Sequence, residues 1–266
     1  MSDRVAEDIA AAHPSAITEL ARAWRAARSV VVLTGAGLST ASGIPDFRSP
    51  GGRWELYQPV PIQDFLASEA SRREYWHYKG ETWEIIRGAR PNPAHRALAE
   101  LASRQRIALL VTQNVDGLHE RSDFPLDRLV NIHGSDAAVE CMRCGRRAPR
   151  EEAQRAWEGG AAVPSCGCGG PWKPATISFG QSLVADDLER ALAAAETCDL
   201  FVAAGTSLVV GPINEMLPVA KRAGARSAIL TASETPFDSI ADWRIDEPLE
   251  GVLPRLRDLV LAPEPV

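Results

Sequence analysis

The first long apolar run of the chain reads Val30-Val31-Val32-Leu33-Thr34-Gly35-Ala36-Gly37 and ends in a glycine turn. A β-branched run that stops at glycine is typical of a buried parallel strand. Backbone N–H groups in such a turn can face a phosphate, and glycine lets a pyrophosphate come close. The full G-x-G-x-x-G fingerprint is absent because Thr40 stands in place of its third glycine, so this stretch alone leaves nucleotide binding open.

Similar short apolar runs recur at residues 107–111, 200–204 and 228–230. Helical spacing of apolar residues occurs at 17–28, before the first run, and a helix-like segment at 213–223 separates the last two runs. This alternation predicts an α/β fold with a parallel sheet and right-handed crossovers.

Two stretches interrupt the alternation. Residues from about 140 to 172 contain two cysteine pairs, several glycines and many arginines, which predicts a small module inserted into the α/β domain. Residues from about 49 to 93 are mostly helical in pattern and rich in aromatic side chains. We expect the first fourteen residues and the end of the chain, 262–266, to be irregular.

The cysteine pairs are Cys141-Met142-Arg143-Cys144 and Cys166-Gly167-Cys168. Paired cysteines on such knuckles can supply four thiolates in a tetrahedron, which suits zinc, although the second pair has one intervening residue instead of two. Four thiolates leave no coordination position for water or substrate, so the zinc is predicted to be structural. The fifth cysteine, Cys198, precedes a predicted strand and is expected to be buried as a small apolar residue.

Polar residues follow two of the predicted strands, at 112–119 and at Gly205-Thr206-Ser207. Ligands of open α/β sheets bind beyond the carboxyl ends of strands, so these residues could converge with the glycine turn on one crevice. Ordinary turn chemistry also explains Gly205-Thr206-Ser207. The polar loop 43–49 is either a solvated loop with local ion pairing or a flap over a ligand, with Phe47 as its apolar lid.

His133 lies at the end of a predicted short strand and precedes a glycine. Imidazole titrates near neutral pH and suits general-base catalysis. A structural histidine that is hydrogen-bonded in the core or in a turn would show the same sequence pattern. The sequence G-x-S-x-G does not occur, so acyl transfer to a serine is unsupported.

Composition sets broader limits. The 266 residues are 45% hydrophobic, enough for one large domain or for one domain with a small insert. The net charge of −6 argues against a nucleic-acid binder. The acidic N-terminus shows no export signal, and no apolar stretch approaches the roughly 18 residues of a membrane helix. We therefore expect a cytoplasmic protein.

Taken together, these segments resemble the sirtuin family, and they occur in the family's order over roughly residues 30–254. The matching blocks are Gly35-Ala36-Gly37-Leu38-Ser39, Gly43-Ile44-Pro45-Asp46-Phe47-Arg48, Thr112-Gln113-Asn114-Val115-Asp116-Gly117-Leu118-His119, His133-Gly134, the four paired cysteines, Phe179-Gly180 and Gly205-Thr206-Ser207. The resemblance covers nearly the whole chain.

The resemblance implies one catalytic domain spanning residues 1–266. A Rossmann-like part would comprise about 15–50, 93–135 and 175–262, with a helical insertion at about 51–92 and a zinc-binding insertion at about 136–174. It also implies an NAD-dependent protein lysine deacetylase or deacylase that transfers the acyl group to ADP-ribose and releases nicotinamide. Its partners would be proteins with acylated lysines, and neither nucleic acid nor membrane. The preferred acyl chain and the oligomeric state stay open.

By the same resemblance, three residues would be catalytic. His133 would take a proton from a ribose hydroxyl, while Asn114 and Asp116 would hold the ribose and the nicotinamide amide. Phe47 would shield the reactive carbon from water. The other residues expected at NAD are Gly35, Ala36, Gly37, Ser39, Asp46, Arg48, Gln113, Gly205, Thr206, Ser207, Thr231 and Leu249. Those expected at the peptide substrate are Ile177, Phe179 and Gly180.

The chain departs from the family pattern in several places. Gln181 replaces the usual glutamate beside the substrate groove, and Thr231 replaces a common asparagine on the adenosine ribose. Trp76 and Lys79 stand where desuccinylase-type sirtuins carry tyrosine and arginine, so no strong succinyl preference is expected.

Three functions remain distinguishable. The first is lysine deacylation, the second is ADP-ribosyl transfer to protein or NAD hydrolysis at the same site, and the third is a non-catalytic NAD sensor. A histidine base together with a substrate strand favours deacylation.

Overall fold

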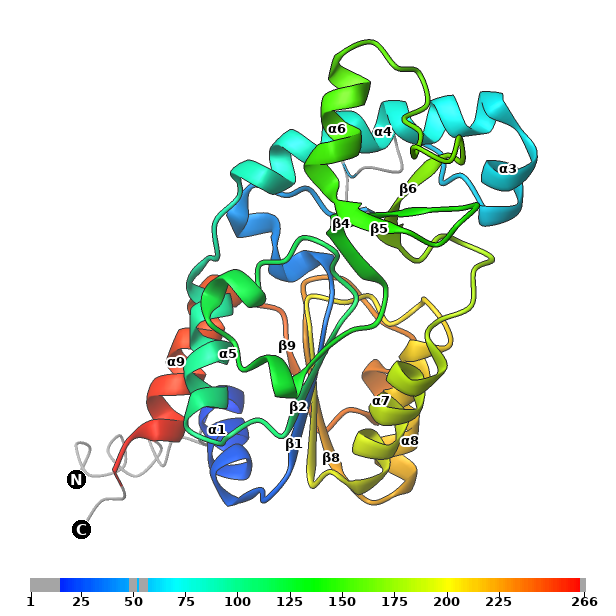
Figure 1. Ribbon diagram of the computed structural model, residues 1–266. Helices are drawn as coiled ribbons and strands as arrows, with labels where there is room; N and C mark the ends of the chain where they lie inside the picture. The colour runs from blue at the N-terminus through cyan, green and yellow to red at the C-terminus, as the bar shows by residue number, and fades with distance from the viewer. Residues whose placement is uncertain (1–14, 48–51, 53–56, 264–266) are drawn as a thin grey trace, which may run out of the picture.

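The computed structural model describes residues 15–47, 52 and 57–263. Its larger sheet has six parallel strands in the order β3-β2-β1-β7-β8-β9 (Figure 1). The strands are β1 (Val30–Thr34), β2 (Leu109–Thr112), β3 (Leu129–Asn131), β7 (Leu200–Ala204), β8 (Arg226–Leu230) and β9 (Trp243–Ile245). The predicted parallel α/β sheet is confirmed.

Helices cover both faces of this sheet (Figure 1). One face packs against α1 (Ala16–Ala26), α5 (Pro93–Ser103) and α9 (Leu249–Leu261), and the other against α7 (Ala185–Thr197) and α8 (Met216–Arg222). The central strands are buried on both faces, which explains why they read as continuous apolar runs. None of the helices in the described part of the chain combines the length and apolar character that a bilayer crossing requires.

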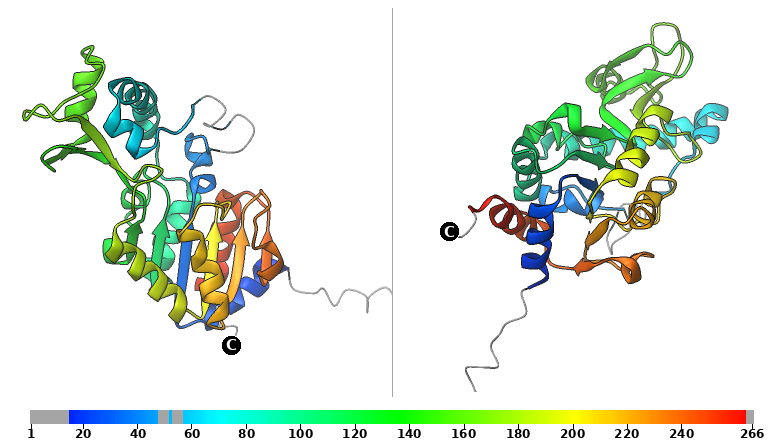
Figure 2. Two further views of the ribbon diagram at one scale, coloured as in Figure 1. Left: turned by 90° about the vertical axis from the view of Figure 1, so that its right-hand side faces the viewer. Right: turned by 90° about the horizontal axis from the view of Figure 1, so that it is seen from below.

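A second, smaller unit lies beyond the carboxyl ends of the large sheet (Figures 1 and 2). It contains an antiparallel sheet in the order β5-β4-β6, the helix α6, and the helices α3 and α4. Their bounds are β4 (Gly134–Cys141), β5 (Arg147–Pro149), α6 (Arg150–Glu158), β6 (Trp172–Thr176), α3 (Ile62–Ala67) and α4 (Glu69–Gly88). These elements share their own apolar core, which includes Phe65, Trp76 and Trp172.

The strand order reverses direction at the centre of the large sheet. From β1 the chain proceeds to β2 and β3 on one side, whereas β7, β8 and β9 lie on the other side. Between β1 and β7, the turns that follow the two strands touch backbone to backbone. The Gly35 N–H donates to the Ala204 carbonyl at 3.1 Å and the Gly37 N–H to the Gly205 carbonyl at 2.9 Å. This reversal is where α/β sheets bind ligands.

Some elements differ from the sequence-based expectation. The predicted helix at 213–223 begins as a 3-10 turn, Ile213–Glu215, before α8. The strand before His133 ends at Asn131, so His133 lies in the short link between β3 and β4. Strand β9 was not predicted from the sequence, because three residues with an arginine in the middle give no recognisable apolar run.

A buried ionic cluster joins the two sequence insertions. The Asp136 carboxylate, on β4, lies 3.5 Å from Arg150 Nε of α6 and 3.9 Å from Lys79 Nζ of α4. The Asp136 and Arg150 side chains are fully buried. The Arg150 guanidinium also lies 4.7 Å and 5.1 Å from the ring centroids of Trp76 and Trp83. One carboxylate thus bridges cations from two segments that are far apart in the sequence.

Two buried histidines pack together beneath the carboxyl ends of β1 and β2. The rings of His95, on α5, and His119 have centroids 5.1 Å apart, and His119 Nε2 lies 3.1 Å from Thr34 Oγ1. The two ring nitrogens of His95 have no hydrogen-bond partner among the described residues. Burial lowers the pKa of His95 to about 4 and the pKa of His119 well below its ordinary value. Both rings are therefore neutral at pH 7.

We expect the free energy of unfolding to fall as the pH drops from 6.5 towards 4, because the unfolded histidines bind protons that the buried rings exclude. The lowering of the His95 pKa from 6.5 to about 4 means that the free energy of unfolding is about 3 kcal/mol smaller below pH 4 than above pH 6.5. Urea unfolding at several pH values measures this. His95→Gln should flatten the dependence, whereas the exposed His77→Gln should not. Equal pH dependence in the wild type and His95→Gln would contradict this account.

Candidate active site

A cleft of about 1430 Å³ crosses the carboxyl ends of the large sheet and extends to the smaller unit. The described residues of its walls lie mainly in seven segments, within 35–40, 44–47, 113–116, 176–183, 205–212, 231–234 and 246–250. His133, residues 57–60 and parts of α4 and α7 complete the lining. The segments that carry the predicted site residues are therefore brought together around one cavity.

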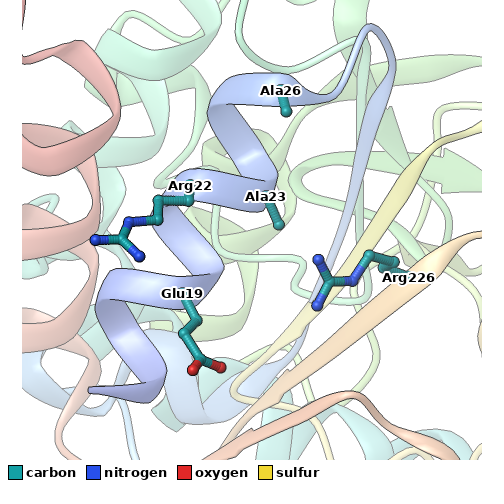
Figure 3. Close-up of a pocket in the computed structure, with 5 residues that line it drawn as sticks. All are labelled: Glu19, Arg22, Ala23, Ala26 and Arg226. Atoms are coloured by element: carbon teal, nitrogen blue, oxygen red, sulfur yellow. The ribbon is translucent and has the colours of Figure 1, made fainter. Parts of the chain in front are cut away.

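A second hollow, of about 350 Å³, lies between α1 and the start of β8 (Figure 3). It is lined by Glu19, Arg22, Ala23, Ala26 and Arg226, and the Arg226 guanidinium lies over the ring of Trp243. Among the described residues that line it, there is no histidine, cysteine or hydroxyl group that could serve as a base or nucleophile. The large cleft is the candidate active site.

The glycine turn packs so closely on the neighbouring turn that no side chain would fit there. A Cβ atom at Gly35 would lie 2.7 Å from the Gly205 carbonyl oxygen, and one at Gly205 would lie 2.4 Å from the Leu38 backbone nitrogen. Gly205 also has a positive φ of 65°. A cradle of bare backbone at the strand-order reversal suits the pyrophosphate of a dinucleotide.

Asn114 and Asp116 belong to one buried hydrogen-bond network beside the glycine turn. Asn114 Nδ2 donates to the Gly35 carbonyl at 3.0 Å and to Ser39 Oγ at 3.1 Å. Ser39 Oγ donates to Asp116 Oδ2 at 2.7 Å, and Asp116 Oδ1 accepts the Leu118 N–H at 2.9 Å. Burial raises the pKa of Asp116 despite these hydrogen bonds. The network fixes both side chains against the cleft.

His133 presents a basic nitrogen at the cleft wall. Its Nδ1 lies 3.1 Å from the Gln113 carbonyl oxygen, and a carbonyl can only accept, so the hydrogen bond assigns the ring proton to Nδ1. Burial lowers the His133 pKa, and the Gln113 hydrogen bond only partly opposes it. The imidazole is therefore neutral at pH 7, with Nε2 available as a proton acceptor.

Gln113 links this base to the far side of the glycine turn. Its Nε2 donates to Thr206 Oγ1 at 2.8 Å, and Thr206 Oγ1 also accepts the Leu208 N–H. Thr206 and Ser207 both line the cleft. The loops after β2 and β7 are thus tied together across β1.

Thr231 and Leu249 line the cleft on the β8 and β9 side. Thr231 follows β8, and its N–H donates to the Ile245 carbonyl of β9. Leu249 is buried at the start of α9 and belongs to the main core. Asp46 and Phe47 line the same cleft, whereas Arg48 lies outside the described residues.

The loop after β6 carries Phe179 and Gly180 at the cleft mouth, where Phe179 is 47% exposed. The Phe179 carbonyl accepts the Ile62 N–H at 2.9 Å, and the Gly180 carbonyl accepts Gln63 Nε2 at 3.1 Å. Helix α3 therefore holds this loop. Gln63 was not singled out from the sequence, because nothing local to α3 indicates a partner 117 positions away.

The residues that flank Phe179 and Gly180 are also fixed by hydrogen bonds. The Ile177 N–H donates to the His133 carbonyl at 2.8 Å, which ties the expected substrate strand to the candidate base. Gln181 turns back onto its own loop, where its Oε1 accepts the Ser178 N–H at 3.1 Å. Gln181 thus stabilises the loop that carries Phe179 through an acceptor oxygen that a glutamate would also supply.

Helix α4 presents Tyr75, Tyr78 and Lys79 to the cleft. Trp76 does not belong with them: it is fully buried, and its Nε1 donates to the Trp172 carbonyl at 2.9 Å. Trp76 and Lys79 are the residues that align with the tyrosine and arginine of desuccinylase-type sirtuins. Lys79 lines the cavity, but Trp76 faces the core of the smaller unit.

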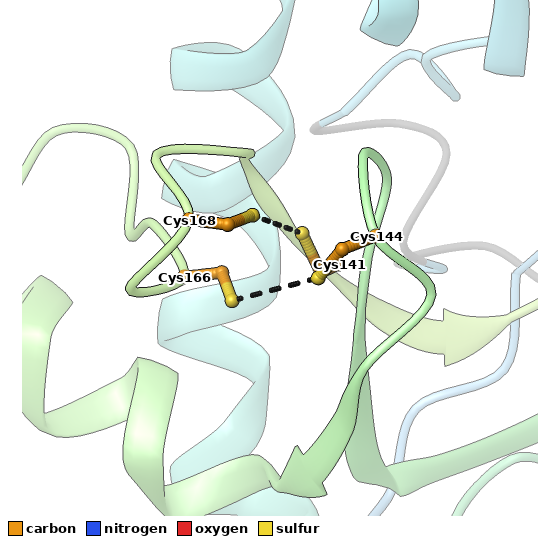
Figure 4. Close-up of side chains that lie close together, drawn as sticks. All are labelled: Cys141, Cys144, Cys166 and Cys168. Atoms are coloured by element: carbon orange, nitrogen blue, oxygen red, sulfur yellow. Dashed lines mark hydrogen bonds between the residues drawn. The ribbon is translucent and has the colours of Figure 1, made fainter.

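The four paired cysteines converge at one end of the small sheet (Figure 4). Their sulfur atoms all lie within 4.8 Å of one another, and the Cys141–Cys168 and Cys144–Cys166 pairs are 3.5 and 3.9 Å apart. Zn–S bonds of about 2.3 Å in a tetrahedron place sulfurs about 3.8 Å apart, so the cluster fits zinc. A full set of four thiolates makes such a zinc structural.

Comparisons with known proteins agree with the resemblance found in the sequence. A sequence model of the Sir2 family matches residues 35–212. NAD-dependent protein deacetylase 1 of Bradyrhizobium diazoefficiens is 41% identical over 81% of this chain and 85% of its own length. An NAD-dependent protein deacetylase of Rhodopseudomonas palustris is 40% identical over 88% and 93%.

Solved structures agree in the fold. A Sir2 structure with a deacetylated peptide and 3′-O-acetyl ADP-ribose has a TM-score of 0.86 and 31% identity, covering 91% of this chain and 97% of that one. A Sir2 structure with a peptide and NAD⁺ has a TM-score of 0.83 and 31% identity, covering 90% and 96%. From the family match and these relatives, we conclude that the chain belongs to the Sir2 family, the sirtuins.

Proposed function

We propose that this protein is an NAD-dependent protein lysine deacetylase that transfers the acetyl group to ADP-ribose and releases nicotinamide. One observation carries the proposal: a neutral imidazole, His133, lines the same cleft as a bare-backbone glycine cradle and a buried Asn114–Asp116 network. Relatives that bear this activity in their names support it.

The cleft suggests how NAD lies. Its pyrophosphate would rest on Gly35, Ala36 and Gly37, with the nicotinamide half towards β2 and β3, where Asn114 and Asp116 line the wall. Its adenosine half would lie over β7, β8 and β9, beside the residues of that wall: Gly205, Thr206, Ser207, Thr231 and Leu249. Bound NAD would supply the ribose carbon from which nicotinamide leaves and to which the acetyl oxygen adds.

His133 would act as the general base. Gln113 holds its Nδ1 proton, so Nε2 is the atom that accepts a proton from a ribose hydroxyl. The lowered pKa keeps the ring in its basic form at neutral pH.

Phe47, which lines the cleft, would exclude water from the reaction. Asp46 and Ser39 would complete this wall, and Arg48 remains a predicted contributor to the cofactor site. Ile177, Phe179 and Gly180 would contact the substrate strand, on a loop that α3 already holds in place.

We also propose the division of the chain. Residues 136–174 would form a zinc-binding insertion, 51–92 a helical insertion, and the remaining 15–50, 93–135 and 175–262 the Rossmann-like part. Zinc on Cys141, Cys144, Cys166 and Cys168 would stabilise the insertion and take no part in the reaction.

His133→Ala should lower kcat for an acetyl-lysine peptide by about 10²–10⁴-fold while NAD still binds, because only the proton acceptor is lost. The assay follows nicotinamide, the free-lysine peptide and O-acetyl-ADP-ribose. His77→Ala, an exposed histidine of α4, is the control and should keep wild-type rates. Wild-type turnover by His133→Ala would exclude His133 as the base, and nicotinamide without peptide deacetylation in the wild type would indicate NAD hydrolysis or ADP-ribosyl transfer.

Purified protein should contain one zinc per chain, and its removal should destabilise the fold without supplying or removing a catalytic group. Cys144→Ser should lose zinc and lower the melting temperature by about 10 °C or more, since a structural zinc contributes several kcal/mol. Cys198→Ala keeps all four ligands and should retain the metal. Folded, active protein without zinc by elemental analysis would refute the structural role.

Gln63→Ala should raise the KM for the peptide about fivefold and leave the KM for NAD unchanged, because one hydrogen bond that holds the Gly180 carbonyl is lost. Asp64→Ala, the neighbouring exposed residue of α3, reports any general effect on the helix. If Gln63→Ala changes both KM values equally, or neither, Gln63 does not position the peptide loop.

A further inference from the structure

One arginine that does not line the cleft holds the segment that carries Asp116. Arg121 belongs to a 3-10 turn, Glu120–Ser122, which follows this segment in the chain. Its Nη2 donates to the Asp116 carbonyl at 2.7 Å, and its Nε donates to the Gly117 carbonyl at 3.3 Å. The Asp116 carboxylate is already fixed by the hydrogen bonds of the network described above. Arg121 therefore fixes the backbone of a residue whose side chain is also held.

The same guanidinium reaches the C-terminal end of α4. Arg121 Nη1 donates to the Ala89 carbonyl at 2.9 Å, and Nη2 donates to the Ile86 carbonyl at 3.1 Å. The last carbonyls of a helix have no partner within the helix and carry a partial negative charge, so a cation is favourable there. Ile86 lines the cleft. Arg121 thus joins one wall of the cleft to the backbone of Asp116.

The backbone beside Asp116 needs such a restraint. Gly117 has a positive φ of 69°, and a Cβ atom there would meet no atom closer than 3.9 Å. Glycine is therefore required at this position for its conformation and not for close packing, and its freedom would let the adjoining peptide groups rotate. Arg121 holds the carbonyls of both peptide groups that flank the Gly117 Cα atom. It supplies the order that the glycine itself does not.

We infer that Arg121 is a positioning residue for Asp116, and that its guanidinium holds the Asp116 segment against the end of α4 in the geometry that the reaction needs. The inference rests on the proposed function, in which Asp116 contacts the nicotinamide half of NAD. One guanidinium can reach carbonyls in two segments because its donors lie in a rigid plane. An ammonium group keeps the charge but not this arrangement of donors, so Arg121→Lys separates geometry from charge.

Amide hydrogen exchange, measured by NMR without NAD or peptide, tests the restraint directly. The Leu118 N–H, which donates to Asp116 Oδ1, should exchange at least about fivefold faster in Arg121→Lys than in the wild type. Arg128→Lys is the matched control. Arg128 also lies in a 3-10 turn and donates to two backbone carbonyls, one of them in the last turn of α5, but it does not line the cleft. This control should leave the exchange of Leu118 unchanged.

Steady-state release of nicotinamide, in the presence of an acetyl-lysine peptide, shows whether the restraint serves the reaction. Arg121→Lys should lower kcat by about 10- to 100-fold, since a misplacement of about 1 Å can cost this much. The KM for the peptide should not change, because the hydrogen bonds of the Arg121 side chain go to the Asp116 segment and to the end of α4. Arg128→Lys should keep the wild-type kcat. Added guanidinium ion should restore part of the activity of Arg121→Ala, whereas ammonium ion should not.

Unchanged exchange of Leu118, or unchanged kcat, in Arg121→Lys would overturn the inference. Equal losses in Arg121→Lys and Arg128→Lys would also overturn it, because a general loss of stability would then be the cause. Circular dichroism melts report folding, and Arg121→Gln, which should show the same changes, takes the place of Arg121→Lys if that variant does not fold.

The readouts also separate this inference from the proposed function. A wild type that releases nicotinamide without deacetylating the peptide would refute the proposed deacetylase and leave the comparison of the arginine variants valid. A wild type that releases no nicotinamide would overturn both, since there would be no reaction for Asp116 to serve.

Discussion

The approach of Gly35 to Gly205 is the constraint on which the rest of the site depends. Two turns from neighbouring strands touch through their backbones, and a single added Cβ at either glycine would collide with the other turn. The contact creates a side-chain-free cradle and also aims the Gly35 carbonyl at Asn114 Nδ2, 3.0 Å away. The same backbone geometry therefore accommodates a phosphate and orients a polar side chain at the adjacent strand end.

The parallel sheet could be predicted because its central strands are buried on both faces, so each appears as an unbroken apolar run. The location of the site followed from the same feature, since the carboxyl ends of parallel strands share one edge. Strand β9 could not be predicted this way: Trp243-Arg244-Ile245 is too short, and it is fixed by pairing with β8. Cysteine spacing predicted a four-ligand cluster, and the sulfur positions agree with it.

Residues of the cleft that depend on helix orientation were harder to predict. Along α4, Tyr75, Tyr78, Lys79, Thr82 and Ile86 line the cavity, whereas Trp76 faces the core of the smaller unit. A sequence alignment fixes positions but not the rotation of the helix about its axis, so it could not show that Trp76 is buried in the core of the smaller unit. Gln63 was missed for a related reason, because its partner at Gly180 is brought near only by the folding of the whole smaller unit.

The Asp136 carboxylate has a consequence for how such proteins can be recombined. It lies between Lys79 of one inserted segment and Arg150 of the other, in an interior where an ion left without its counterion costs about 3–5 kcal/mol. A chimera that receives the cysteine-bearing segment from a relative without the matching helix would leave one of these buried charges without its partner. The two segments must therefore be exchanged together, although they are separate in the sequence.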